Sequence, residues 1–361
     1  MPDDSIILNG INGATGDYFT PPISQADAAA FATGQPQDPG SLGVLRNLAQ
    51  QASQATLGLP FDRDPKRLEE AGWAVVFHQQ EDDAVKKALQ PLIEHRQKQI
   101  GDDRIVKVLD YATGESLQAW LARYRVAPGS VDATKVPLYV LLAGSPDKIP
   151  FDFGHLLDVE YCVGRLHFET PGGYAQYASS VIAYETGATA ANRRQVAFWG
   201  PCHNNDYPTR LSSTMLVKPL AQGQSGQPSL IQRISDRTGK PFETRYFAPT
   251  DSTKANLLSL LRPVGDALSP SFLFTASHGM GWPLNHPMQP AATGALLCQD
   301  FPGAGLGPIK PAHYLAAADL PADARVHGLV SFHFACFGAG IPSTDRFTHK
   351  ANTPPTQIAP A

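Results

Sequence analysis

The sequence predicts an α/β fold with mostly parallel sheets, flanking helices and two side-by-side subdomains. From about residue 64 onward, short apolar runs of strand character alternate with runs of helical character, a pattern that implies parallel strands joined by right-handed crossovers. The run at 138–143 is apolar without interruption, which is typical of a parallel strand covered on both faces. At 361 residues the chain exceeds the usual size of one hydrophobic core, so two domains are expected.

The composition divides the chain into three parts. Residues 1–60 are low in charge and rich in Gly, Pro, Gln and Ala, which predicts an irregular lead-in with one helix near 45–55. Residues 61–190 form the first predicted α/β subdomain. The stretch at 187–194 is polar and rich in small residues, so the second subdomain is expected at 191–361.

Local signals place the elements of the first subdomain. Asp64-Pro65 is a favourable helix start, because Asp can cap a helix and Pro suits its first position, and Gly72 is the expected end of that helix. Pro91 is expected to kink or divide the charged helix at 82–99. Strands are expected at 73–77, 104–109, 138–143 and 163–166, and further helices at 116–124 and from 170 to about 185.

The same alternation continues in the second subdomain. A hairpin is expected through 295–298. Strands are expected at 196–199, 243–247, 272–274 and 329–334, and helices near 212–221, 256–261 and 313–318.

Composition excludes several function classes. The formal net charge of −4 gives no reason to expect a nucleic acid or an anionic membrane as partner. No window of about 18 uninterrupted apolar residues exists, so no bilayer span is expected. The first residues lack a basic and an apolar signal region, which favours the cytoplasm. No nucleotide-binding motif or metal-ligand spacing is present, so no cofactor or metal is expected.

The four cysteines lie at 162, 202, 298 and 336 with no CxxC spacing, so a disulfide framework is not expected. Cys162 follows an apolar run and is expected to be a buried structural thiol. Cys202-His203 is a conceivable metal-ligand pair, but no partner spacing supports it.

One Cys/His pair carries the functional signal. The apolar run at 272–274 leads to Ser277-His278-Gly279, and the run at 329–334 leads to Cys336. Each run is expected to be a buried strand. In an open α/β sheet, ligands bind in the crevice at the carboxyl ends of the strands. The pattern therefore predicts an imidazole and a thiol at the mouth of one crevice.

This pair fits nucleophilic catalysis. A thiolate is the nucleophile, and a neighbouring imidazole removes the thiol proton. Gly279 and Gly338, close to the two key residues, let backbone N–H groups approach a substrate carbonyl. The alternative is a structural cysteine at a strand end together with an unrelated surface histidine.

These segments resemble a known family. Ser277-His278-Gly279 and Phe334-Ala335-Cys336-Phe337-Gly338 are similar to the His-Gly and Ala-Cys motifs of caspase-fold (clan CD) cysteine peptidases. The middle of the chain resembles the gingipain branch, and the CHAT peptidases are the nearest rival. The resemblance covers roughly 135–345 and is carried by the segments 141–146, 149–150, 158–161, 163–166 and 184–185.

The resemblance implies a caspase-like fold and a cysteine endopeptidase that acts on a protein or peptide substrate through an acyl-enzyme. His278 is then the general base and Cys336 the nucleophile. The backbone N–H groups of Gly279 and Cys336 form the oxyanion hole.

The resemblance also bears on specificity. Phe334 stands where caspases have a Gln that shapes the pocket for an acidic P1 side chain, so cleavage after aspartate is not expected. Gingipain-like and CHAT enzymes prefer a basic P1 residue held by an acidic pocket residue. Asp300, Asp206 and Asp345 are candidates for that pocket residue, and Trp282 is a candidate for lining the cleft, although it could equally serve packing.

Caspase-fold enzymes continue past the catalytic Cys with further strands, whereas 343–361 has loop composition. A sheet ending at the Cys-bearing strand would leave an unpaired edge. We therefore expect a processed or divided protein, whose catalytic domain is completed by a second polypeptide. Arg346 and Lys350 would suit self-cleavage by an enzyme with basic specificity.

A binding or sensor subunit that keeps the fold without turnover is the alternative from another class. A serine hydrolase is not supported, because its G-x-S-x-G motif is absent. His333 is expected to be a hydrogen-bonded histidine within the sheet.

Overall fold

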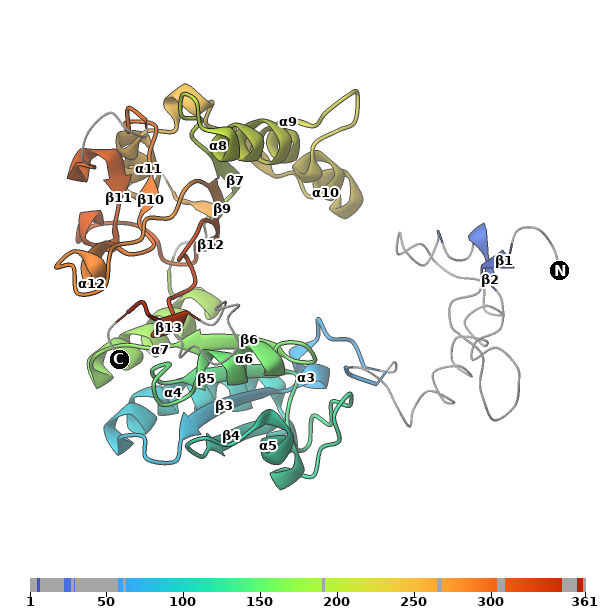
Figure 1. Cartoon of the computed structure of the whole chain (residues 1–361). Coiled ribbons are helices and arrows are strands. Elements are labelled where there is room, and N and C mark those ends of the chain that lie inside the picture. Colours follow the sequence, from blue (N-terminus) through green and yellow to red (C-terminus); the bar gives the residue numbers. More distant parts are fainter. Residues whose placement is uncertain are drawn as a thin grey trace. The chain divides into compact units, whose positions relative to one another are not determined.

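The computed structural model describes residues 5–6, 23–26, 29, 58–60, 63–189, 192–264, 268–303, 309–345 and 356–359. The chain forms two compact units, Met1–Ser179 (unit 1) and Ser180–Ala361 (unit 2) (Figure 1). Most of the predicted lead-in, including the helix expected at 45–55, lies outside the described residues. Its described part contains β1 (Ser5–Ile6) paired antiparallel with β2 (Ile23–Ser24).

Unit 1 contains a four-stranded parallel sheet. Its order is β4-β3-β5-β6, so the first strand lies between the second and the third. The strands are β3 (Trp73–His78), β4 (Val106–Tyr111), β5 (Tyr139–Ala143) and β6 (Cys162–Leu166). The helical elements are α3 (Leu68–Ala71), α4 (Asp83–Ile100), η1 (Asp103–Ile105), α5 (Leu117–Arg123) and α6 (Phe151–Leu157). Helix α7 (Pro171–Glu185) begins in unit 1 and ends in unit 2.

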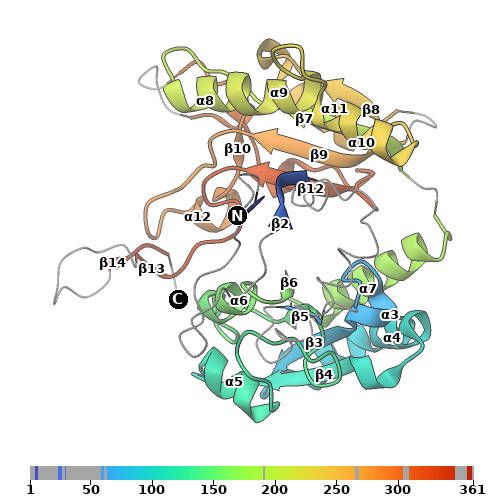
Figure 2. The same ribbon diagram turned by 90° about the vertical axis from the view of Figure 1, so that its right-hand side faces the viewer.

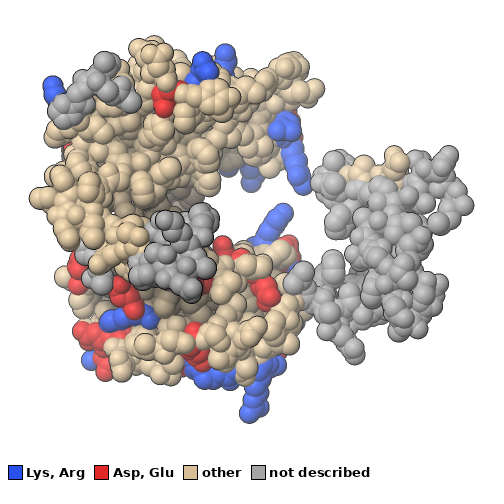
Figure 3. Space-filling view, viewed as in Figure 1, with Lys and Arg blue, Asp and Glu red and all other residues tan. Residues whose placement is uncertain are grey.

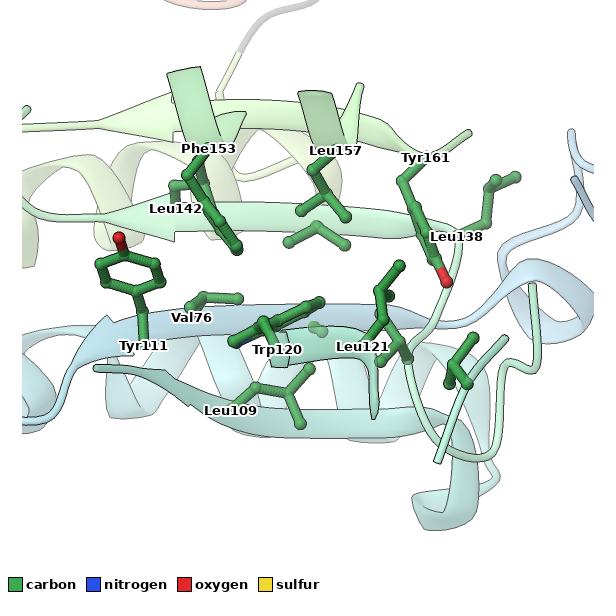
Figure 4. Close-up of a cluster of buried hydrophobic side chains, with 14 of the residues drawn as sticks. Val76, Leu109, Tyr111, Trp120, Leu121, Leu138, Leu142, Phe153, Leu157 and Tyr161 are labelled. Atoms are coloured by element: carbon green, nitrogen blue, oxygen red, sulfur yellow. The ribbon is translucent and has the colours of Figure 1, made fainter. Parts of the chain in front are cut away.

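Alternation along the strands builds the core of unit 1. Residues of β3 point to opposite faces in turn, and Val76 faces a cluster that includes Trp120 of α5 and Phe153 of α6 (Figure 4). Val75 and Phe77 are buried on the other side, where α4 packs against β3 and β4. Burial on both faces explains why β3 and β5 read as continuous apolar runs.

Two helix predictions for unit 1 need correction. α4 begins after Asp82, whose carboxylate accepts the N–H of Ala84, and it continues through Pro91 to Ile100 without division. Asp64-Pro65 does not start a helix, because the Asp64 side chain accepts the N–H of Lys66 and forms a local turn. The helix begins only at Leu68 and ends, as expected, at Gly72 with φ 71°.

Unit 2 repeats the same sheet topology. Its parallel strands have the order β12-β9-β7-β8, so the first strand in the chain again lies between the second and the third. The strands are β7 (Arg193–Trp199), β8 (Glu243–Tyr246), β9 (Pro270–Ala276) and β12 (Val330–Phe334). The helical elements are α8 (Tyr207–Leu211), the π-helical turn η2 (Ser212–Val217), α9 (Lys218–Gln222), α10 (Leu230–Thr238), η3 (Pro249–Asp251), α11 (Lys254–Leu261), α12 (Gln289–Ala292), η4 (Pro311–His313) and η5 (Ala317–Asp319).

Helices cover both faces of this sheet. On one face Phe198 packs with Val217 and with Ile231 of α10. On the other face Trp199 and Leu273 pack with Leu257 of α11. The predicted α/β architecture of mostly parallel sheets with flanking helices is therefore confirmed in both units.

Three details of unit 2 differ from the predictions. α10 was not expected. The helix predicted at 313–318 is replaced by β11 (Tyr314–Leu315), which pairs antiparallel with β10 (Leu296–Leu297) and is flanked by η4 and η5. The C-terminal stretch of loop composition contains β13 (Thr344–Asp345) paired with β14 (Thr356–Gln357).

The prediction that the Cys-bearing strand is buried is also wrong. All five residues of β12 are exposed, and Val330, Phe332 and Phe334 remain 60%, 51% and 54% accessible. The reason is position: among the described residues β12 is an edge strand that pairs with β9, and on that side Phe332 stacks on Phe274. Figure 2 shows β12 at this edge of the sheet, beside β9.

Within the described parts of the chain, no helix is both long enough and apolar enough to cross a lipid bilayer.

Candidate active site

The register of two paired strands brings the predicted Cys and His segments to one edge. β12 and β9 are parallel, with Phe334 opposite Ala276, and the Ser277 N–H donates to the Phe334 carbonyl at 3.1 Å. His278 and Cys336 each lie two residues beyond this last pair. They therefore leave neighbouring strands at the same carboxyl edge, at matching positions.

A third residue joins them from the next strand. The loop after β7 contains Asp206, whose Oδ2 accepts a hydrogen bond from His278 Nε2 at 3.0 Å. Since β7 adjoins β9 on the side opposite β12, Asp206, His278 and Cys336 follow three consecutive strands in that order. The β7–β9 boundary is also the point where the strand order reverses, which is where open α/β sheets bind ligands.

Asp206 is fixed by its own helix. It caps the N-terminus of α8: its Oδ2 accepts the Thr209 N–H at 3.0 Å and also the Thr209 hydroxyl. Partial burial raises the pKa of Asp206, but the hydrogen bonds from Thr209 and His278 outweigh it, and the pKa lies below its ordinary value. The carboxylate is therefore ionised, and Nε2 of His278 is the donor.

A second histidine, His203, lies beside His278 and bonds to Thr209. His203 is 4% exposed, and its ring lies parallel to that of His278 with centroids 6.4 Å apart. Its Nε2 bonds to the carbonyl of Cys298 at 2.9 Å, and its backbone N–H donates to the Thr209 hydroxyl. Burial lowers the pKa of His203, which keeps this ring neutral beside the site.

Cys336 lies in a strained turn. The Gly338 N–H approaches the Ala335 carbonyl at 3.4 Å, and Phe337 has a φ of 59°. A left-handed conformation costs a residue with a Cβ roughly 1–2 kcal/mol, and such strain concentrates at functional sites. The turn leaves the Cys336 thiol exposed.

Gly279 allows this turn to approach the His278 loop. An added Cβ at position 279 would lie 1.6 Å from the carbonyl oxygen of Cys336, so only glycine fits there. Gly279 pairs with Leu296 in an isolated bridge, whose hydrogen bonds are Leu297 N–H to His278 O and Met280 N–H to Ala295 O. Because these bonds come from the residues on either side, the Gly279 N–H itself points away from β10.

The dyad is not closed by a hydrogen bond. Nε2 of His278 donates to Asp206. In the described part of the chain, Nδ1 of His278 has no hydrogen-bond partner. No hydrogen bond joins it to Cys336 Sγ. Catalytic hydrogen bonds are often loose in a protein without substrate. Nδ1 is thus the ring nitrogen left to accept a proton.

The other thiols differ sharply in exposure. Cys162, predicted to be buried, is exposed, because β6 is an edge strand and Cys162 is its first residue. Cys298 is fully buried, and burial raises its pKa to about 12. Cys202 is half-buried, with its backbone N–H and carbonyl held by the Gln299 amide.

The predicted substrate-binding residues occupy defined positions. Asp300 Oδ2 accepts the backbone N–H of Lys254, at the start of α11. Trp282 is half-buried beside Met280, and its ring stacks on His286 with centroids 4.7 Å apart. The side chain of Asp345 lies outside the described residues, as do Arg346 and Lys350.

His333 forms the hydrogen bond expected of a sheet histidine, from Nδ1 to the Thr275 hydroxyl at 2.8 Å. In the Cys202-His203 pair, Nε2 of the His203 ring is bonded to the Cys298 carbonyl. Within the described ranges, no group of three or more His, Cys, Asp or Glu side chains is arranged to hold a metal ion.

Sequence reasoning missed the contact of Asp206 with His278 and the roles of His203 and Thr209. One signal was present: Asp206-Tyr-Pro-Thr209 follows a strand, and an Asp three residues before a Thr can cap a helix at a fixed position. The chain matches no protein-family model, and a search of curated proteins likewise found no match.

Proposed function

We propose that this chain is a cysteine endopeptidase that hydrolyses peptide bonds with Cys336 as nucleophile and His278 as base. One observation carries the proposal: Asp206, His278 and Cys336 follow three consecutive parallel strands at one edge, and Asp206 already bonds to Nε2 of His278. An acid, a base and a thiol in this order form the constellation of nucleophilic acyl transfer.

The chemistry follows from these roles. His278 Nδ1 accepts the Cys336 proton, and the thiolate attacks the substrate carbonyl. The Gly279 and Cys336 N–H groups stabilise the oxyanion. His278 then protonates the leaving amine as the C–N bond breaks, which leaves a thioester. Water, deprotonated by His278, hydrolyses the thioester to the acid and restores the thiol.

The finer assignment rests on the sequence resemblance. The chain is proposed to be a caspase-fold enzyme of the gingipain-like kind, with the CHAT peptidases as the rival, and to act in the cytoplasm. A basic P1 residue is part of that resemblance. Asp206 and Asp300 already have partners in unit 2, so the pocket carboxylate is not assigned to either.

The two edge strands of the unit 2 sheet differ in charge, and this difference supports the pairing of β12 with a second polypeptide. β8 carries Glu243 and Arg245, charged side chains that discourage a further strand. β12 has no Asp, Glu, Lys or Arg and exposes three large apolar side chains. We propose that a strand of another polypeptide pairs with β12 and completes the catalytic domain.

A catalytically silent binding subunit is the alternative, and the open Cys336–His278 pair is the observation that favours it. Alkylation separates the two. The intact protein would be treated with iodoacetamide across pH 5–9 (about the range in which thiols and imidazoles titrate), and each cysteine followed by mass spectrometry. An active dyad makes Cys336 react at lower pH in the wild type than in His278→Ala.

Cys162 is also exposed and checks in each variant that the alkylation conditions are the same, but partial burial and Asp158 raise its pKa. The deciding comparison is therefore Cys336 with and without His278: equal pH profiles of Cys336 in the wild type and in His278→Ala would sink the peptidase proposal. Peptides with Arg, Lys, Asp or Leu at P1, tested on wild type and Cys336→Ala, then define the specificity.

A further inference from the structure

Unit 2 also carries a groove that is not lined by Asp206, His278 or Cys336. It lies between α9 and α10 and has a volume of about 490 Å³. We call it the α9–α10 groove. Its lining includes Met215, Leu216, Pro219, Leu220, Leu230 and Arg233.

A tight turn at 223–228 contributes to the lining of the groove, and there Gln224 and Gln227 exchange two backbone hydrogen bonds of 3.2 and 2.9 Å. Below it, Val217, Ala221 and Ile231 are buried against the sheet. One wall includes the π-helical turn η2, a form that often marks functional sites.

The walls expose more apolar surface than their own packing needs. Met215 is 61% accessible, and Leu230 and Ile234 are 37% accessible. Met215 and Leu230 line the groove, and Ile234 lies one turn beyond Leu230 on the same side of α10, so an apolar strip continues from the groove along α10. Methionine adapts to differently shaped partners, and contiguous exposed apolar surface marks interaction sites.

Basic side chains surround this strip. The segment 207–240 contains five basic residues and one acidic residue, Asp236; of these charged residues, Arg233 lines the groove. Lys218, Arg233 and Arg237 are exposed, and among the described residues none of them forms an ion pair. On the face drawn in Figure 3, blue side chains lie over the end of unit 2 that carries α10.

We propose that the α9–α10 groove binds an acidic amphipathic helix of a partner protein. Apolar side chains of that helix would enter the groove, and its Glu or Asp residues would face Lys218, Arg233 and Arg237. A helix fits better than an added strand, because the walls are helices whose backbone groups are already paired. Charge complementarity sets the sign of the partner.

The groove lies on the helical run that begins beside Asp206. α8, η2 and α9 form one continuous helical run from Tyr207 to Gln222, about 25 Å long at 1.5 Å per residue. Its first turn is capped by Asp206, and the groove lies at its other end. A protein bound there is held on the same unit as the candidate active site. The inference itself does not depend on the peptidase proposal, because binding is read without turnover.

The test is fluorescence anisotropy with the full chain and a labelled helical peptide of about 16 residues. The peptide has Leu at i, i+3, i+4 and i+7 and Glu at its polar positions. We expect binding that weakens with added salt. Arg233→Glu with Arg237→Glu should weaken binding at least about tenfold, because two attractions become repulsions.

Matched controls separate the groove from general charge. Lys87→Glu with Lys98→Glu changes the net charge equally on exposed positions of α4 and should leave the affinity unchanged. Met215→Ser with Ile234→Ser removes apolar surface without changing charge and should weaken binding several-fold. A scrambled peptide of the same composition should bind poorly.

Three results would overturn the proposal: no binding of the peptide, equal loss in the α4 control, or binding of anionic phosphatidylserine vesicles in place of the peptide. Thermal unfolding of each variant checks that it is folded. Should the arginine variant fail to fold, the salt dependence and the Met215/Ile234 variant still decide the question.

Discussion

The Nε2 atom of His278 lies 3.0 Å from Oδ2 of Asp206, although the two residues are separated by 72 positions in the sequence. Because Asp206 also caps α8 through Thr209, the carboxylate is held by a rigid element. An ionised carboxylate accepts, so Nε2 carries the hydrogen and Nδ1 presents a lone pair. The tautomer that a thiol base requires is thereby fixed before substrate arrives.

The first prediction concerns this tautomer. Asp206→Asn keeps a side chain that can cap α8 but removes the charge that holds His278. We expect kcat/KM for a cleaved peptide to fall about 10²–10⁴-fold, by analogy with loss of the orienting acid in hydrolase triads. The pH profile of Cys336 alkylation should move toward that of Cys336 in His278→Ala.

Asp300→Asn is the control for this substitution, because Asp300 caps α11 through the Lys254 N–H and does not contact His278. It should keep activity within a few-fold of wild type. If both variants lose activity equally, the contact of Asp206 with His278 does not govern the reaction.

The second prediction concerns the close approach at Gly279. Gly279→Ala would place a methyl carbon 1.6 Å from the Cys336 carbonyl oxygen, so the turn at 335–338 must move. Overpacking of this kind costs about 1–3 kcal/mol of unfolding free energy. We expect that loss in urea unfolding, together with a large loss of peptidase activity from the displaced oxyanion donors.

Gly172→Ala provides the comparison. It lies in α7, where the nearest atom to an added Cβ is Thr170 Oγ1 at 3.6 Å, and alanine favours a helix over glycine. Its stability should stay equal or rise. A Gly279→Ala protein as active and stable as Gly172→Ala would show that the two loops are not held together.

Part of this site could be foreseen from local sequence. The apolar runs before His278 and Cys336 define parallel strands, and parallel strands end at a common edge. That reasoning brings His278 and Cys336 to the same edge without any long-range information. It cannot supply Asp206 as their partner, because the strand order that places β7 beside β9 depends on which helices cover which face.

Burial was harder to foresee than secondary structure. The apolar sequence of β12 suggests a covered strand, yet Phe332 is half exposed, because position in the sheet decides burial and sequence pattern does not report position. Cys162 was misjudged for the same reason at the edge strand β6. Short strands such as β11 could not be predicted either, because two residues show no hydrophobic periodicity.

The third prediction follows from the uncharged edge. β12 should promote self-association of the isolated chain, and Ser331→Lys should reduce it, because an edge lysine disfavours strand pairing. Sedimentation velocity at increasing protein concentration measures the effect. Thr244→Lys on β8, an edge that already carries Glu243 and Arg245, should change little. Unchanged association of the Ser331→Lys protein would argue against β12 as a pairing edge.

The fourth prediction is a pH dependence from His203. Burial lowers its pKa, the charge of Asp206 opposes this, and His278 adds to it. The folded protein therefore keeps His203 neutral while the unfolded chain binds a proton near pH 6.5 (about the ordinary pKa of histidine). Stability is full above that pH and is lost as the pH falls toward the folded pKa. His203→Gln cannot titrate and can still donate to the Cys298 carbonyl. Urea unfolding at several pH values should show wild type losing more free energy on acidification than His203→Gln; parallel losses would mean that His203 is not held neutral.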